Sequence, residues 1–150
     1  MTAPAPTVTC QNCGKRNRLR PEANGVPRCG NCHAPLPWLV DAGPESLDAE
    51  LDASVPVLVD LWASWCGPCK WIAPVMEALA REHAGHAKVV RVNVDEAPEI
   101  SARFAVKGIP TLVLIHDGEE VDRVAGALPK PQLEEWLEGH LGARASSAAT

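Results

Sequence analysis

Six cysteines, arranged in three Cys-x-x-Cys pairs, are the residues of this 150-residue sequence best suited to carry chemistry. The pairs are Cys10/Cys13, Cys29/Cys32 and Cys66/Cys69. A thiolate can attack a disulfide or bind a soft metal ion. Because structural disulfides are rare in reducing compartments, the surroundings of each pair must decide between metal binding and redox chemistry.

The first two pairs are separated by fifteen residues, a spacing typical of a four-cysteine zinc ribbon. We therefore predict one zinc ion with four thiolate ligands: Cys10, Cys13, Cys29 and Cys32. Zinc binding can contribute on the order of 10 kcal/mol to a segment with few large apolar side chains. The closed ligand set predicts a structural ion; the alternative is a redox-sensitive ion that strong oxidants release by oxidising the thiolates. The alternative interpretation is two short-range redox pairs, and His33 beside Cys32 is expected to be a bystander.

The third pair follows the apolar run 57–62 and opens a segment with helical apolar spacing at Ile72, Val75, Met76 and Leu79. A strand end that passes into a helix start offers unpaired N–H groups and the positive end of the helix dipole. Such surroundings can lower a cysteine pKa from about 8.5 to about 7. Pro68 suits the first helical turn. Cys66 is thus expected to be a reactive thiolate.

Strand-like and helix-like segments alternate after residue 36. We expect strands at 38–40, 57–62, 89–94, 111–115 and 121–125, the last two joined by a tight turn at Asp117-Gly118. Helices are expected at 45–51, from 66 onward, at 98–105 and from 131. This order predicts an α/β fold with a mixed central sheet and helices on both faces.

Composition suggests four regions along the chain: a disordered N-terminus (1–9), a zinc-ribbon-like module (10–35), an α/β domain (36–141) and a disordered tail (142–150). The chain is 46% apolar, and no stretch approaches the ~20 apolar residues of a membrane span. Since the first residues lack the features of a signal peptide, we expect a cytoplasmic protein without membrane partners.

The segment Trp65-Cys66-Gly67-Pro68-Cys69-Lys70 resembles the active-site motif of the thioredoxin family. The strand before it, Gly108-Ile109-Pro110-Thr111 and the Gly126-Ala127 loop also resemble that family, so the likeness spans residues 36–141. The four-cysteine module is similar to that of zinc-containing bacterial thioredoxins of the thioredoxin 2 type. The resemblance implies a thioredoxin fold and protein disulfide reduction.

In the mechanism that this resemblance implies, Cys66 attacks a substrate disulfide and Cys69 resolves the mixed disulfide. Cys66 is expected to be exposed and Cys69 shielded. Asp60 would accept a proton from Cys69, although an aspartate at a solvent-facing strand end is the alternative. The family often has a lysine near this aspartate where this chain has Arg91, whose permanent charge would favour an ionised Asp60.

The substrate-binding positions implied by the resemblance are Trp65, Gly67, Pro68, Ile109, Pro110 and Gly126. The Ile109–Pro110 bond is expected to be cis, which leaves the Ile109 backbone free to pair with an extended substrate. Only about 5–6% of X–Pro bonds in folded proteins are cis, so the resemblance alone supports this expectation. Four histidines, at 83, 86, 116 and 140, are expected at the surface without a function.

The implied partners are disulfide-containing proteins and an NADPH-dependent flavoenzyme, thioredoxin reductase, with no organic cofactor bound to this chain and a monomeric state. A disulfide-forming oxidant or isomerase is one alternative, which the Gly-Pro between the cysteines disfavours. The other is a binding or chaperone factor, because residues 1–35 carry a net charge of +4 while the whole chain carries −5. Nucleic acid is not the expected partner, since that segment lacks aromatic side chains.

Overall fold

The computed structural model describes residues 7–19 and 25–149. Its strands are β1 (Thr7–Thr9), β2 (Arg16–Arg18), β3 (Leu39–Ala42), β4 (Val57–Trp62), β5 (Lys88–Asn93), β6 (Thr111–His116) and β7 (Glu119–Ala125). Its helices are α1 (Leu47–Leu51), α2 (Gly67–Glu82), α3 (Pro98–Arg103) and α4 (Lys130–Ala149). The alternation expected after residue 36 is confirmed, with boundaries shifted by one to three residues for most elements.

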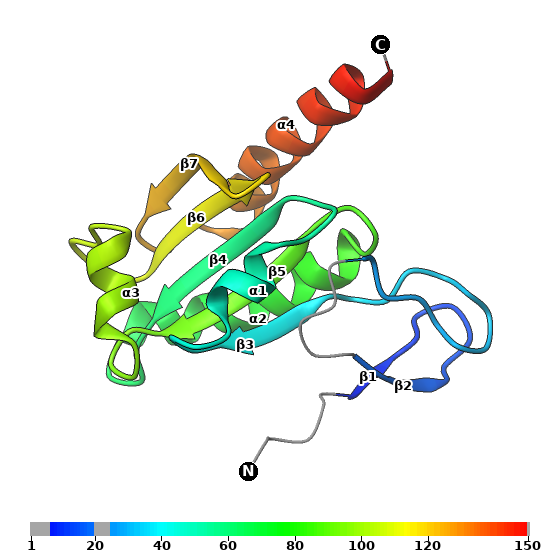
Figure 1. Cartoon of the computed structure of the whole chain (residues 1–150), viewed down its shortest axis with the longest axis horizontal. Helices are drawn as coiled ribbons and strands as arrows, with labels where there is room; N and C mark the ends of the chain where they lie inside the picture. The colour runs from blue at the N-terminus through cyan, green and yellow to red at the C-terminus, as the bar shows by residue number, and fades with distance from the viewer. Residues whose placement is uncertain (1–6, 20–24, 150) are drawn as a thin grey trace.

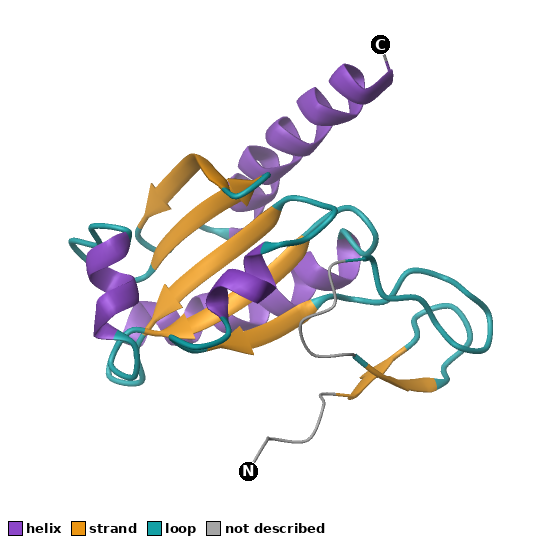
Figure 2. Cartoon of the chain, in the orientation of Figure 1, coloured by secondary structure: helices purple, strands orange, loops and turns teal. Residues whose placement is uncertain are grey.

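Five strands form one mixed sheet in the order β3-β5-β4-β6-β7. The first three of these strands are parallel, and β6 and β7 each run antiparallel to their neighbour. The β6–β7 turn is the expected one, because Asp117 and Gly118 both have positive φ angles of 53° and 79°. Figure 2 shows helices on both sides of this sheet. The predicted α/β fold class is therefore confirmed.

Side-chain alternation along β4 divides the core into two layers. Val57, Val59 and Leu61 face a layer that includes residues of α1 and α3, such as Leu47 and Ile100. Leu58 faces the opposite layer, which includes Ile72, Met76 and Leu79 of α2 and Leu133 and Leu137 of α4. The period of two places Asp60 on the same side as Leu58. Asp60 therefore points toward the layer of the helix that carries Cys69.

The N-terminal module is a two-stranded antiparallel β1–β2 sheet and two cysteine turns. Residues 1–6 lie outside the described residues, whereas Thr7–Thr9 pair with Arg16–Arg18, so the ordered module includes three residues expected to be disordered.

At the other end of the chain, α4 runs to Ala149, beyond the boundary expected at residue 141. Residues 143–149 contain no glycine or proline to end the helix there.

The module packs onto the end of the sheet opposite to Cys66 and Cys69. Cys10, Leu19 and Cys29 share a buried apolar cluster with Leu36 and Trp38, just before β3. The Gln11 side chain donates to the Arg81 carbonyl near the end of α2 at 2.9 Å. In Figure 1 the β1–β2 module lies at the right, whereas the β4 arrowhead, which leads toward Cys66, lies at the left. Sixteen residues of α2 separate the two ends, a helix length of roughly 24 Å.

Candidate functional site

Cys66 and Cys69 lie where β4 passes into α2. Cys66 is the N-cap residue of α2, and its Sγ accepts a hydrogen bond from the Cys69 backbone N–H at 3.2 Å. Pro68 occupies the first turn, as expected. The two cysteines form a disulfide across a Cα–Cα distance of 5.3 Å. The structure thus shows the oxidised form of a pair held at a helix N-terminus, where a thiolate released by reduction is stabilised.

Both sulfurs are almost fully covered in this oxidised form. Cys66 is 4% exposed and Cys69 is 1% exposed, so the expectation of an exposed Cys66 is wrong here, although the order of exposure is as predicted. Ala63 packs with the pair, and Trp62, Val94 and Ile109 pack around it. The Cys66 Sγ lies 3.7 Å from the Ile109 carbonyl oxygen. The resemblance placed Ile109 at the substrate-binding site, but it did not reveal that this segment covers Cys66.

The loop beside Cys66 contains the expected cis bond between Ile109 and Pro110. The Gly126 N–H donates to the Pro110 carbonyl at 2.8 Å, which brings the end of β7 to the same place. Gly126 has a φ of 99°, a conformation that favours glycine. The structure therefore brings Pro110 and Gly126 together near the cysteine pair.

Trp65 forms an apolar surface beside the disulfide. Its side chain is 69% exposed, and its Nε1 donates to Asp95 Oδ2 at 2.9 Å, which restrains the ring. Gly67 and Pro68 are also exposed in the first turn of α2. Another tryptophan, Trp71 of α2, is 76% exposed, so it does not belong to the core. Exposed aromatic side chains of this kind suit contact with another protein.

Asp60 is a fully buried carboxylate, with 0% of its surface exposed. Its Oδ2 accepts from Arg91 Nε at 3.1 Å, and its Oδ1 has no partner among the described residues. Burial raises the pKa of Asp60, and the positive charge of Arg91 opposes that rise without cancelling it. The alternative of an aspartate at a solvent-facing strand end is therefore wrong. The Arg91 guanidinium also lies 4.7 Å from the centre of the Trp62 ring.

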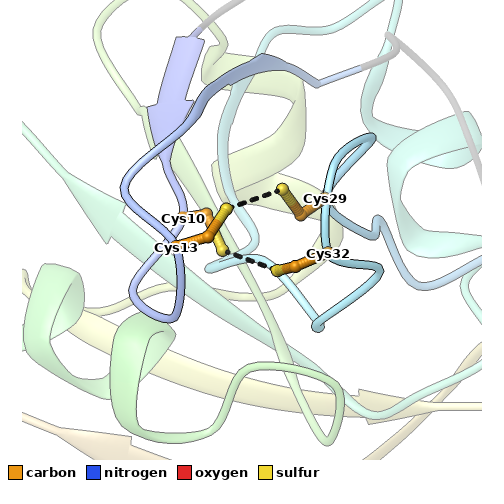
Figure 3. Close-up of side chains that lie close together, drawn as sticks. All are labelled: Cys10, Cys13, Cys29 and Cys32. Carbon is orange, nitrogen blue, oxygen red and sulfur yellow. Dashed lines mark hydrogen bonds between the residues drawn. The ribbon is translucent and has the colours of Figure 1, made fainter.

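The other four cysteines converge on one point (Figure 3). Their Sγ atoms all lie within 4.8 Å of one another, and the Cys10–Cys32 and Cys13–Cys29 sulfur pairs are each 3.5 Å apart. Four thiolates about 2.3 Å from a tetrahedral zinc ion would have sulfurs about 3.8 Å apart. The spacing of the sulfurs therefore fits a metal ion with a closed sulfur shell.

The two cysteine turns have the same backbone design. In the first, the Gly14 N–H donates to the Cys10 carbonyl; in the second, the His33 N–H donates to the Cys29 carbonyl, both at 2.9 Å. Both donors have positive φ angles, 80° at Gly14 and 65° at His33. His33 therefore occupies the turn position that Gly14 occupies in the first turn, and it does not belong to the four-sulfur cluster.

Amide groups surround the sulfurs of this cluster. The Asn31 backbone N–H donates to Cys29 Sγ at 3.4 Å, and the Asn12 side chain donates to Cys32 Sγ at 3.4 Å. Hydrogen bonds, first among them that from the Cys32 backbone, lower the pKa of Cys29 to about 6. Such donors stabilise negative charge on sulfur. The donor set thus meets the requirements of a thiolate metal site, in which the module's four cysteines can hold a metal ion.

A family model for thioredoxin matches residues 37–139. Thioredoxin 1 of a Nostoc species is 50% identical over 91 residues, which are 61% of this chain and 85% of that protein. The thioredoxin of Staphylococcus aureus is 48% identical over 97 residues, 63% of this chain and 93% of its own. That of a Synechocystis species is 42% identical over 107 residues, 68% of this chain and all of its own length. The chain belongs to the thioredoxin family and is a thiol–disulfide oxidoreductase.

Proposed function

We propose that this chain is a protein disulfide reductase in which Cys66 and Cys69 supply two electrons. The Cys66 thiolate attacks one sulfur of a substrate disulfide, forms a mixed disulfide and releases the other substrate sulfur as a thiolate. Cys69 then attacks Cys66, which releases the reduced substrate and leaves the Cys66–Cys69 disulfide. The observation that carries the proposal is the position of Cys66 Sγ, which accepts the Cys69 N–H at the start of α2.

In this proposal Asp60 accepts the proton of Cys69 as that thiol becomes the resolving nucleophile. Support comes from its burial, its raised pKa and its place on the α2 side of β4. A raised carboxyl pKa brings the proton affinity of Asp60 closer to that of a thiol. Its Oδ1, for which the described part of the chain offers no hydrogen-bond partner, is the oxygen that would take the proton. Arg91 would restrain the other oxygen and limit the rise in pKa.

The substrate is proposed to lie along the Ile109–Pro110 segment and across Trp65, Gly67 and Pro68, with Gly126 at one edge. The exposure of Trp65 and the closeness of Ile109 to Cys66 support this placement. An extended substrate segment would pair with the Ile109 backbone. Re-reduction would come from a thioredoxin reductase that uses NADPH, in the cytoplasm. Among the described residues, no helix has the length and apolar character to cross a membrane.

For the N-terminal module we propose zinc as the metal held by Cys10, Cys13, Cys29 and Cys32, as in thioredoxins of the zinc-containing thioredoxin 2 type. Zinc favours a tetrahedral four-sulfur shell and would supply folding free energy rather than reactivity, since no ligand position is open. Purified protein should contain about one zinc per chain, and a Cys29→Ser variant should lose it. Iron in place of zinc would contradict the assignment.

The test of the reductase proposal is an NADPH-coupled assay with insulin as substrate and a bacterial thioredoxin reductase. We expect turnover by the wild-type chain, and a Cys69→Ser variant should accumulate a mixed disulfide through Cys66. The reduction potential separates reductase from oxidant, since thioredoxins lie at about −270 mV and a strong oxidant at about −120 mV. A potential near the second value, with no insulin reduction, would overturn the proposal.

A further inference from the structure

His83 ends α2 in a buried position, against the expectation of a functionless surface histidine. It is the C-cap residue of this helix and is 9% exposed. Its backbone is held on both sides: its N–H donates to Leu79 at 2.9 Å, and its carbonyl accepts from His86 at 2.8 Å. Its Nε2 is buried and has no hydrogen-bond partner among the described residues. An unsatisfied buried polar atom of this kind costs free energy and needs an explanation.

Two glutamates of α4 face this imidazole. Glu134 and Glu138 are four residues apart, so they share one face of the helix. One ring nitrogen of His83 and one carboxylate oxygen from each glutamate all lie within 4.8 Å of one another. The imidazole therefore lies beside the pair of carboxylates. His83, at the end of α2, thus lies next to Glu134 and Glu138 in the first turns of α4.

Within the described residues, these three side chains form no hydrogen bond or ion pair with one another. Glu134 instead has Oε2 at 3.5 Å from the Lys130 ammonium group, and Lys130 also pairs with Glu82 at 3.0 Å. Two neighbouring carboxylates repel each other, and the buried Nε2 of His83 has no hydrogen-bond partner among the described residues. A cation bound between the imidazole and the two carboxylates would offset the repulsion and give the imidazole nitrogen a partner.

We propose that His83, Glu134 and Glu138 bind a divalent transition-metal cation of the zinc class, at a site separate from the four cysteines. An imidazole with two carboxylates is a ligand set that zinc accepts, at about 2.0–2.2 Å from each atom. Ligands around such an ion lie roughly 3–3.5 Å apart, so the side chains must close slightly. Glu138 is exposed and Glu134 half-exposed, which leaves them free to do so. Water would fill the remaining position.

The two metal sites differ in chemistry, and the difference makes them separable. The four-cysteine site offers only sulfur, whereas this site offers one nitrogen and two oxygens. Thiolates bind zinc more tightly than a three-ligand site open to water. Dialysis against a weak chelator should therefore leave the first site loaded and the second empty. The ion at the second site would join the C-terminus of α2 to α4 without contact with Cys66.

The experiment uses the full chain with its tightly bound metal, dialysed as above and titrated with zinc chloride by calorimetry. We expect one further equivalent to bind. Glu138→Gln should weaken this binding by about tenfold or more, since even residues that only orient a metal ligand are worth 10–100-fold in affinity. Glu135→Gln, an exposed neighbour with the same change of charge, is the matched control and should bind as the wild type does.

A second readout guards against misfolding of a variant. Cobalt added to the dialysed protein should give a spectrum without sulfur-to-metal charge transfer, and His83→Ala should abolish it while His86→Ala should not. Zinc that binds Glu138→Gln and Glu135→Gln equally would overturn the proposal, as would the absence of any equivalent beyond the first. A thiolate-type cobalt spectrum for the added equivalent would also overturn it.

Discussion

The Cys66/Cys69 pair and the two N-terminal cysteine pairs share one sequence spacing but have different backbones. After Cys66 the chain enters a sixteen-residue helix, so Cys66 and Cys69 face each other within one turn. After Cys13 and Cys32 the chain turns back at a residue with positive φ, Gly14 or His33. The sulfurs of each turn therefore face those of the other turn (Figure 3). The following residues, rather than the spacing, decide whether two cysteines bond to each other or to a metal.

The comparison also shows what the two regions share. In both, a backbone N–H donates to the first sulfur of a pair: Cys69 to Cys66 at 3.2 Å and Asn31 to Cys29 at 3.4 Å. Such donors favour the thiolate in either setting. Ionisation of sulfur is thus common to both chemistries, because metal ligands and nucleophiles both need it. The difference lies in the partner that each thiolate meets.

The largest expected effect separates the two regions by function. Cys66→Ser removes the proposed nucleophile, so insulin reduction should fall by several orders of magnitude. Cys13→Ser removes one proposed metal ligand at the other end of the sheet and should leave the reaction of Cys66 and Cys69 near the wild-type rate. The measurement is the initial rate of insulin reduction at a temperature where both variants are folded. Equal losses in the two variants would contradict this division of roles.

The next largest effect concerns Asp60, the buried carboxylate that we propose accepts the proton of Cys69. Asp60→Asn keeps the shape but cannot accept the proton of Cys69, so turnover should fall by about 100-fold, the lower end for general acid–base groups. The loss should appear in resolution of the mixed disulfide rather than in its formation. Stopped-flow measurement of both steps checks this. If both steps keep their wild-type rates in Asp60→Asn, Asp60 has no part in proton transfer.

Asp60 should also make stability depend on pH. Because burial raises its pKa, the folded chain holds this proton more tightly than the unfolded chain does. Its contribution is most favourable below the unfolded carboxyl pKa of about 3.9 and is lost as pH rises through the folded pKa. Asp60→Asn lacks that loss, so its free energy of unfolding should exceed that of the wild type at pH 8 by about 1 kcal/mol or more. Urea unfolding at pH 8 and pH 5 should show a smaller gap at the lower pH.

Removal of the metal should affect stability more than catalysis. Zinc binding contributes on the order of 10 kcal/mol to segments of this kind, so chelation should unfold the β1–β2 module. Cys10 and Cys29 share a buried cluster with Trp38, so the thermal midpoint of the remaining domain should also fall. Calorimetry with parallel rate measurements at 25 °C tests this. A rate that falls in step with the zinc content, well below the unfolding temperature, would show that the two ends are coupled.

The smallest expected effect tests the backbone design of the turns. Gly14→Ala places a side chain at a φ of 80° and should weaken metal binding by about 1 kcal/mol, which is roughly fivefold. His33→Gly relieves a residue at 65° and should leave binding unchanged or tighten it slightly. Competition with a chromophoric chelator measures both. Weaker binding in Gly14→Ala together with unchanged or tighter binding in His33→Gly would show that the positive-φ conformation, rather than the residue type, is what the metal site requires.

Local pattern alone was enough to predict several parts of this molecule. The β4 run, the apolar face of α2 and the Asp117-Gly118 turn were predicted because side-chain periodicity and turn chemistry act between near neighbours. The convergence of the other four cysteines was predictable because two closely spaced pairs suffice to bring four sulfurs together. The cis bond at Pro110 followed from the family resemblance alone.

The sequence by itself determined the residue types, the three cysteine pairs and the order of strands and helices. The family resemblance added that Arg91 lies near Asp60 and that Ile109 lies at the substrate-binding site. Only the tertiary structure decided that Cys66 is covered beside Ile109 rather than exposed, and that His83 meets Glu134 and Glu138. The physical reason is that each of these contacts joins residues far apart in the chain. The packing of whole helices and strands determines these contacts. Periodicity along the sequence predicts the elements but not which of them pack together.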